Sequence, residues 1–154
     1  MAIEIERKFL VKVDKLPRLE NGLRITQAYI PTANGTTVRV RLAGEKAFLG
    51  VKTPASGFSR HEYEFPIPPE DAREMLREVC LAAAIEKQRF FIQQGQLTWE
   101  IDVFGGKNEG LIVAEIELQS EDQSVTLPDW IAEEVTLDPR FGNCSLARDP
   151  YSTW

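Results

Sequence analysis

The sequence predicts an α+β, mainly β protein: a closed eight-stranded antiparallel β-barrel, or tunnel, with a charged lumen and a few flanking helices. Eight segments alternate polar and apolar residues with the period of two that is typical of strands. Most of them are joined by short turns, as in a meander, and eight is a strand number at which a sheet can close. At 154 residues, the chain is expected to form a single domain over 1–154.

The expected strands end at local turn signals. They cover 2–11, 23–30, 37–42, 46–52, 60–65, a segment from 85 to a turn at 94–95, 97–104 and 111–119. Asn34-Gly35 is a strong hairpin signal. The glycine-rich segment 105–110 is interpreted as a hairpin turn, because it lacks the strand-to-helix context of a nucleotide-binding loop.

One long helix is expected over 70–81, because Pro68-Pro69 precedes it and Glu70 and Asp71 suit its positive N-terminal end. Its apolar stripe needs an apolar surface, so we expect the hydrophobic core between the barrel and the helices. A short helix is expected over 128–135, and the tail at 138–143 is expected to be irregular.

Composition excludes several classes of function. The net charge of −6 argues against a nucleic-acid binder. The chain has neither a membrane-spanning apolar run nor a secretory signal, so we expect a cytoplasmic protein. We interpret Cys80 as helix packing, Cys144 as an unpaired loop thiol and the single His61 as a surface residue.

Charged side chains gather on one face of seven of the eight expected strands. The acids are Glu4, Glu6, Glu62, Glu64, Glu100, Asp102, Glu115 and Glu117, and the bases are Lys8, Arg39, Arg41, Lys52, Arg60, Lys87 and Arg89. Like charges along a strand are destabilising unless opposite charges lie across from them. A barrel with these faces inward meets that requirement; the alternative is an ordinary sandwich or barrel with its charges in water.

The balance of charge indicates what such a lumen would hold. Converging Arg and Lys side chains fit a compact polyphosphate, but the acids would repel it unless divalent cations intervened. Two such cations and one triphosphate would leave the filled site close to neutral. A protein that bound polyphosphate without metal would not need the acids.

Glu4-Ile5-Glu6-Arg7-Lys8 resembles the Glu-x-Glu-x-Lys signature of the CYTH proteins, or triphosphate tunnel metalloenzymes. The ordered set continues with Arg39-x-Arg41, Lys52, Arg60-x-Glu62-x-Glu64, Lys87-x-Arg89, Glu100-x-Asp102, Glu115-x-Glu117 and a closing segment, 138–146. In that segment the family's Asn-Ser pair reads Asn143-Cys144-Ser145. The resemblance implies an eight-stranded antiparallel tunnel that binds triphosphate with divalent metal and, in most members, hydrolyses it.

We assign site roles on this basis. The expected ligands for one or two Mg²⁺ or Mn²⁺ ions are Glu4, Glu6, Glu62, Glu64, Glu115 and Glu117. The expected phosphate-binding residues are Lys8, Arg39, Arg41, Lys52, Arg60, Lys87 and Arg89. Glu100 and Asp102 are expected to support them. The resemblance implies a general base formed by Tyr29 and Lys52, with an ammonium that lowers the tyrosine pKa; the alternative for Tyr29 is a structural rim residue.

The predicted function is metal-dependent hydrolysis of inorganic tripolyphosphate to pyrophosphate and phosphate. The short chain shows no base-recognition element, and its remaining positions are net acidic, which disfavours RNA. The enzyme alternatives are a class IV-type adenylate cyclase and an organic triphosphatase acting on ATP or thiamine triphosphate. The non-enzyme alternative is a polyphosphate or nucleotide binding module. The expected partner is a small-molecule triphosphate, without nucleic acid or membrane, and a homodimer is left open.

Overall fold

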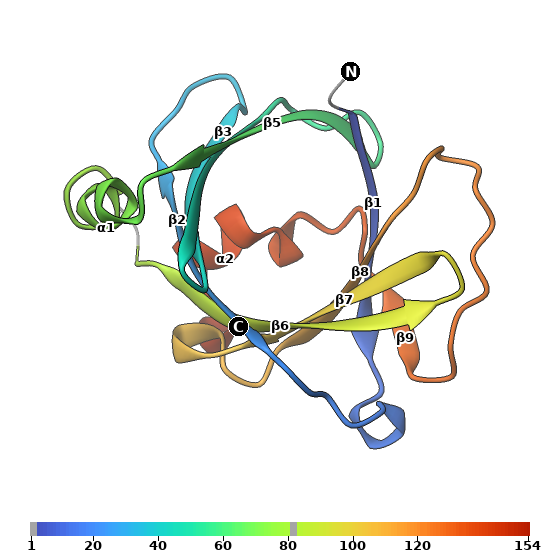
Figure 1. The fold of residues 1–154 in the computed structure, drawn as a ribbon. Helices are drawn as coiled ribbons and strands as arrows, with labels where there is room; N and C mark the ends of the chain where they lie inside the picture. The colour runs from blue at the N-terminus through green and yellow to red at the C-terminus, as the bar shows by residue number, and fades with distance from the viewer. Residues whose placement is uncertain (1–2, 81–82) are drawn as a thin grey trace.

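Eight antiparallel strands close into a barrel in the computed structural model, which describes residues 3–80 and 83–154 (Figure 1). The described residues form nine strands, eight in the barrel and β9 beside β1: β1 (Ile3–Val11), β2 (Leu23–Ile30), β3 (Thr37–Ala43), β4 (Lys46–Lys52), β5 (Ser59–Ile67), β6 (Ile85–Gln94), β7 (Leu97–Phe104), β8 (Ile112–Glu117) and β9 (Ile131–Glu134). The sheet runs β5-β4-β3-β2-β6-β7-β8-β1, and a β1–β5 pairing closes it. The predicted barrel is therefore confirmed.

Helices and 3₁₀ turns lie between and after the strands. They are η1 (Val13–Lys15), α1 (Pro69–Glu78), η2 (Gly106–Asn108), η3 (Pro139–Phe141), α2 (Asn143–Arg148) and η4 (Tyr151–Thr153). Two ends of the predicted elements, Ala2 and Leu81, lie outside the described residues. No helix in the described ranges has both the length and the apolar character needed to cross a membrane.

Strand register turns the charged faces toward one enclosed space. Lys8 pairs with Glu115 across β1 and β8, and Arg89 pairs with Asp102 across β6 and β7. Paired residues of neighbouring strands point to the same side of a sheet, so these pairs form continuous rows around the inner wall. The alternative in which the charges face water is therefore wrong.

Strand β1 has two neighbours along the same edge. Its first residues pair with β5, for example Glu4 with Arg60, and its last residues pair with β9, for example Val11 with Ile131. The helix expected over 128–135 is wrong, because β5 leaves the second half of this edge unpaired and β9 supplies its hydrogen-bond partners.

The outward apolar faces are covered by different elements. Ala72 and Met75 of α1 pack on Val40 and Ala47 of β3 and β4, which confirms the expected core beneath this helix. The outer faces of β1, β7 and β8 form a second cluster around Trp99. The connection after β1, Trp130 and β9 cover this second cluster, so no long helix is needed there.

A third apolar cluster fills one end of the lumen. Ile85 begins β6, Phe104 ends β7 and Val113 lies near the start of β8, so antiparallel pairing brings them to the same rim with their side chains inward. Phe141 and Leu146 of the C-terminal segment pack on them. The expectation of an irregular tail is wrong, since this segment folds into η3 and α2 and closes that end (Figure 1).

Candidate active site

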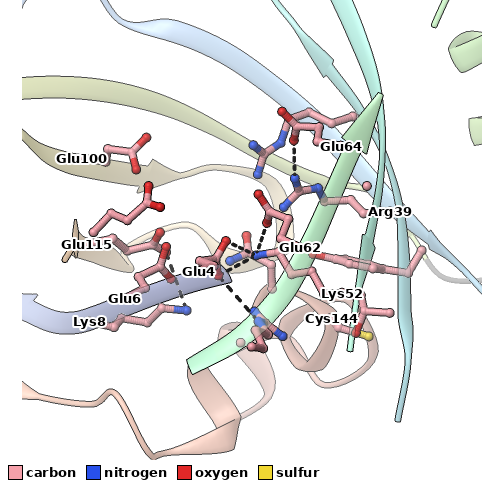
Figure 2. A pocket seen from close by; sticks show the side chains of 18 of the residues that line it. Glu4, Glu6, Lys8, Arg39, Lys52, Glu62, Glu64, Glu100, Glu115 and Cys144 are labelled. Atoms are coloured by element: carbon pink, nitrogen blue, oxygen red, sulfur yellow. Dashed lines mark hydrogen bonds and ion pairs between the residues drawn. The ribbon is translucent and has the colours of Figure 1, made fainter. Parts of the chain in front are cut away.

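The barrel encloses a cavity of about 330 Å³ beside this apolar plug. All the residues predicted from sequence to form the site line it except Asp102, which is fully buried against Lys87 and Arg89. Figure 2 shows carboxylates and cations from several strands pointing toward one another across this space. Thr37, Gly50, Gly142, Asn143 and Cys144 complete the lining.

Lys52 connects the acids of β1 and β5. Its Nζ lies 3.1 Å from Glu4 and 2.9 Å from Glu62, and Arg60 lies 3.6 Å from Glu4. Burial and the neighbouring Glu62 raise the pKa of Glu4. Burial would also raise the pKa of Glu62, but its hydrogen bonds with Glu4 and Lys52 and the charge of Lys52 lower it to about 2. The two carboxyl groups therefore differ in their readiness to ionise.

Asp102 holds two phosphate-binding candidates in place. Its carboxylate is fully buried and accepts hydrogen bonds from Lys87 Nζ at 2.7 Å and from Arg89 Nε and Nη2 at 2.8 and 2.9 Å. Arg89 also pairs with Glu100 at 2.9 Å. Burial lowers the pKa of Lys87 to about 8, although the negative charge of Asp102 acts to raise it. Asp102 thus orients two cations without facing the cavity.

Glu6 and Glu117 bring surplus negative charge to one part of the wall. They pair across β1 and β8, and within the described ranges neither lies in an ion pair. Burial and the charges of Glu115 and Glu4 raise the pKa of Glu6 well above its usual value. Uncompensated carboxylates of this kind suit a divalent cation, whose preferred ligands are oxygens.

The remaining carboxylates are occupied by internal cations. Glu64 pairs with Arg39 at 3.0 Å, and Glu115 with Lys8 at 3.6 Å. In the part of the chain that the structure describes, no three acidic, histidine or cysteine side chains are grouped closely enough to hold a metal. The predicted metal ligands thus line one cavity, but they do not form a finished coordination cage.

Arg39 offers an unused hydrogen-bond donor. Its side chain is 9% exposed, and its buried Nε has no partner among the described residues. Gly50 leaves space for the guanidinium, because a Cβ there would stand 3.3 Å from Nη2. Burial beside Arg39 and Arg89 lowers the pKa of Arg41 to about 10. An anion with several oxygens would satisfy the free donor and relieve the repulsion between the guanidinium groups.

Tyr29 and Lys52 line the same cavity but contact different residues. The Tyr29 hydroxyl accepts a hydrogen bond from Gln27 Nε2 at 3.1 Å, whereas Lys52 is held by two carboxylates. Burial raises the pKa of Tyr29 although Arg39 and Arg41 act to lower it. This direction is opposite to the lowering that we expected from a neighbouring ammonium.

Sequence reasoning assigned no role to the residues that α2 brings to the site. Asn143 accepts hydrogen bonds from Lys87 and Gln27, and Cys144, expected as a loop thiol, lies in α2 at the cavity wall. Their position depends on Leu146, which is buried in the apolar cluster at the end of the barrel. The polar–apolar alternation of strands cannot predict this tertiary contact. The only signal in the sequence was the resemblance of the closing segment.

The closed antiparallel barrel with its lining of carboxylates, lysines and arginines agrees with the resemblance found in the sequence, and the model of the CYTH domain family matches residues 2–149. The chain belongs to this family. It is 44% identical over 154 residues to a protein of Acetivibrio thermocellus named inorganic triphosphatase, covering 100% of this chain and 99% of that protein.

A second relative and a solved structure agree with this assignment. An inorganic triphosphatase of Nitrosomonas europaea is 38% identical over 149 residues, which cover 94% of this chain and 96% of that protein. A crystal structure of an inorganic triphosphatase superposes with a TM-score of 0.66 at 34% identity, covering 93% of this chain and 96% of that one. Membership of this family implies dependence on a divalent metal.

Proposed function

We propose that this protein hydrolyses inorganic tripolyphosphate to pyrophosphate and phosphate. The observation that carries the proposal is the cluster of Arg and Lys side chains around one cavity, with the buried Nε of Arg39 still lacking an acceptor. The relatives that match nearly the whole chain are named for the same activity. Tyr29 is the single aromatic side chain among the described lining residues, so the wall offers little surface for stacking a nucleotide base.

The cations would bind and align the phosphate chain. Arg39, Arg41 and Arg60 approach from β3 and β5, while Lys8, Lys87 and Arg89 approach from β1 and β6. Guanidinium forks match phosphate oxygens, and fixed cations stabilise the charge that develops on the phosphoryl oxygens in the transition state. The ion pairs with Asp102 and Glu64 hold Arg89 and Arg39 in position before substrate arrives, which reduces reorganisation.

The acids would provide the metal site. Glu4, Glu6, Glu62, Glu64, Glu115 and Glu117 are the proposed ligands of one or two Mg²⁺ or Mn²⁺ ions, and the surplus negative charge at Glu6 supports this. When bound, the metal would supply charge neutralisation and an activated water. The Lys52 ammonium, now held by Glu4 and Glu62, would be free to turn toward phosphate once those carboxylates had another cation.

We assign proton transfer to Tyr29 with Lys52. The role predicts that Tyr29→Phe, which keeps the ring and removes the hydroxyl, lowers kcat by roughly 10²-fold or more, the range that general acid–base catalysis supplies. Unchanged turnover would reduce Tyr29 to a structural residue. Tyr63→Phe is the matched control, because Tyr63 is exposed on β5.

A substrate panel tests the reaction itself. Purified protein with Mg²⁺ or Mn²⁺ is offered tripolyphosphate, ATP and thiamine triphosphate, and released phosphate and cyclic AMP are measured. Preferred hydrolysis of tripolyphosphate supports the proposal. Cyclic AMP would indicate a cyclase, a preference for ATP or thiamine triphosphate an organic triphosphatase, and metal-dependent binding without turnover a binding module.

The choice between Mg²⁺ and Mn²⁺, the cytoplasmic location and a homodimer belong to the same proposal. Activity across a metal series after removal of bound metal tests the first. Fractionation of cells that express the natural gene tests the second. Light scattering of the purified protein tests the third.

A further inference from the structure

A buried relay of hydrogen bonds joins the plug helix α2 to Tyr29 and Arg41. Gln27 on β2 is fully buried, and its Nε2 donates to the Tyr29 hydroxyl at 3.1 Å and to Asn143 Oδ1 at 3.2 Å. Arg41 Nε donates to Gln27 Oε1 at 2.7 Å, and Lys87 Nζ donates to Asn143 Oδ1 at 3.0 Å. Two amides thus connect four elements of the cavity wall, β2, β3, β6 and α2.

Donor-only groups at both ends fix the orientation of the two amides. A guanidinium has no acceptor, so the Gln27 atom facing Arg41 must be the oxygen. An ammonium likewise requires the Asn143 atom facing Lys87 to be the oxygen; with a pKa of about 8, Lys87 is protonated at pH 7. The Gln27 NH₂ group must therefore face Tyr29 and Asn143, and a flipped amide would break the chain of bonds.

This orientation decides where the Tyr29 hydroxyl can donate. An amide nitrogen has no acceptor lone pair, so the phenol oxygen receives a hydrogen bond from Gln27 and cannot return one. Among the described residues the Tyr29 hydroxyl has no other partner, and Tyr29 lines the cavity. The O–H proton is consequently directed to whatever occupies the lumen.

We propose that Gln27 and Asn143 are positioning residues that aim the Tyr29 hydroxyl into the cavity and hold Arg41 beside it. Gln27 acts directly on both groups, and Asn143 orients Gln27 while fixing Lys87. The catalytic importance of the relay rests on the proposed function, but its geometry does not. Because Asn143 begins α2, the plug contributes to the arrangement of the site as well as closing the barrel.

Gln27→Glu tests the relay with almost no change in shape. A carboxylate still accepts from Arg41, but it can only accept from Tyr29, so the hydroxyl proton turns away from the lumen. We expect kcat for tripolyphosphate to fall by roughly 10²-fold with little change in KM. In a Tyr29→Phe background the same substitution should have little further effect, because the two residues act as one unit.

A matched control separates positioning from a general effect of the added charge. Gln88→Glu makes the same chemical change on the exposed outer face of β6 and is expected to leave kcat unchanged. Additive losses for Gln27→Glu and Tyr29→Phe would overturn the proposal, since Gln27 would then act independently of Tyr29.

A second readout needs neither substrate nor turnover. In protein with ¹³C at the tyrosine ring carbon that bears the hydroxyl, the Tyr29 resonance is identified by its loss in Tyr29→Phe. It should move in Gln27→Glu and in Asn143→Leu, but stay near its original position in Asn143→Asp, whose carboxylate still accepts from Gln27 and Lys87. An unmoved resonance in folded Gln27→Glu or folded Asn143→Leu overturns the relay. Absence of triphosphatase activity in the unmodified protein would instead overturn only the proposed function.

Discussion

Glu6 has no cation of the described chain within ion-pair distance. Burial first, and then the charges of Glu115 and Glu4, raise its pKa well above the ordinary 4.5. The folded state therefore binds this proton more tightly than the unfolded chain does. The contribution of Glu6 to stability is favourable below pH 4.5 and is lost as the pH rises from 4.5 through the raised folded-state pKa.

The unfavourable effect of Glu6 on stability at high pH leads to a prediction for Glu6→Gln. At pH 8 without metal, the variant should melt roughly 2–4 °C higher than the natural sequence, the shift that about 1 kcal/mol produces in a chain of this length. Added Mn²⁺ should then stabilise the variant less, because one proposed ligand is gone. Scanning calorimetry with and without a chelator measures both effects, and Glu86→Gln on the exposed face of β6 is the control. A lower melting temperature for metal-free Glu6→Gln would contradict this account.

At the scale of elements, one carboxylate stabilises the β6–β7 hairpin. Asp102 pairs directly across from Arg89 and also binds Lys87, so both cations are neutralised inside the wall. Burial would raise the pKa of Asp102, but Lys87 and Arg89 lower it below the ordinary 3.8. Its contribution to stability is therefore present above pH 3.8 and lost as the pH falls through the lowered folded-state pKa.

Asp102→Asn should lower the free energy of unfolding by about 3–5 kcal/mol at neutral pH, because it leaves buried cations without their counter-charge. Denaturant titration measures the loss. The difference in free energy of unfolding between the variant and the natural sequence should become smaller at acidic pH. Glu100→Gln removes a partly exposed partner of the same Arg89 and should cost about 1 kcal/mol or less. Equal losses of unfolding free energy in the two variants would show that burial of an ion pair does not determine how much it stabilises this hairpin.

The plug helix α2 is held by one fully buried side chain, Leu146. Leu146→Ala should lower the free energy of unfolding by about 2–5 kcal/mol, because the apolar cluster at that end of the barrel would keep a cavity. Cys144→Ala, in the same helix but at the charged cavity, should cost less than about 1 kcal/mol. If chemical denaturation finds both variants equally stable, α2 is not anchored through Leu146.

The elements that sequence could predict are those whose signal is local. Alternation with period two located the barrel strands, because one face of each strand is polar, and in seven of the eight charged, while the other is apolar. β9 and α2 were missed because tertiary contacts create them: an unpaired stretch of the β1 edge selects a strand at Ile131–Glu134, and the open barrel end selects a helix around Leu146. The proline and acidic residue at 128–129 favour the start of a helix, but pairing with the β1 edge outweighed that local preference.

The residues that line the cavity also divide into those with a local sequence signal and those without one. Charged lining residues could be predicted from strand parity, and the structure places them together. Gln27 and Asn143 could not be assigned in this way, because an uncharged amide on a strand or in a tail carries no pattern of its own. Their importance becomes visible only when the barrel brings Arg41 and Lys87 to either side of them.

For the molecule as a whole, the inward charges form a nearly balanced set within a chain of net charge −6. In the proposed site, a polyanion alone would be attracted by the bases but repelled by the lumen acids. A metal ion alone would be attracted by the acids but repelled by the bases. Each ligand should therefore bind better when the other is present, and this coupling must be equal in both directions.

Removal of metal tests this coupling. Metal-free protein with imidotriphosphate, whose P–N–P bridges resist hydrolysis, should show little rise in melting temperature, and Mn²⁺ alone should give a modest rise. Both together should exceed the sum of the two, reaching roughly 5–10 °C when the metal–triphosphate pair is near a hundredfold excess over its dissociation constant. Sulfate at equal ionic strength controls for screening. If imidotriphosphate without metal stabilised the protein as strongly as the pair, the lumen acids would have no role in admitting a cation, and the triphosphate would be bound by Arg and Lys side chains alone.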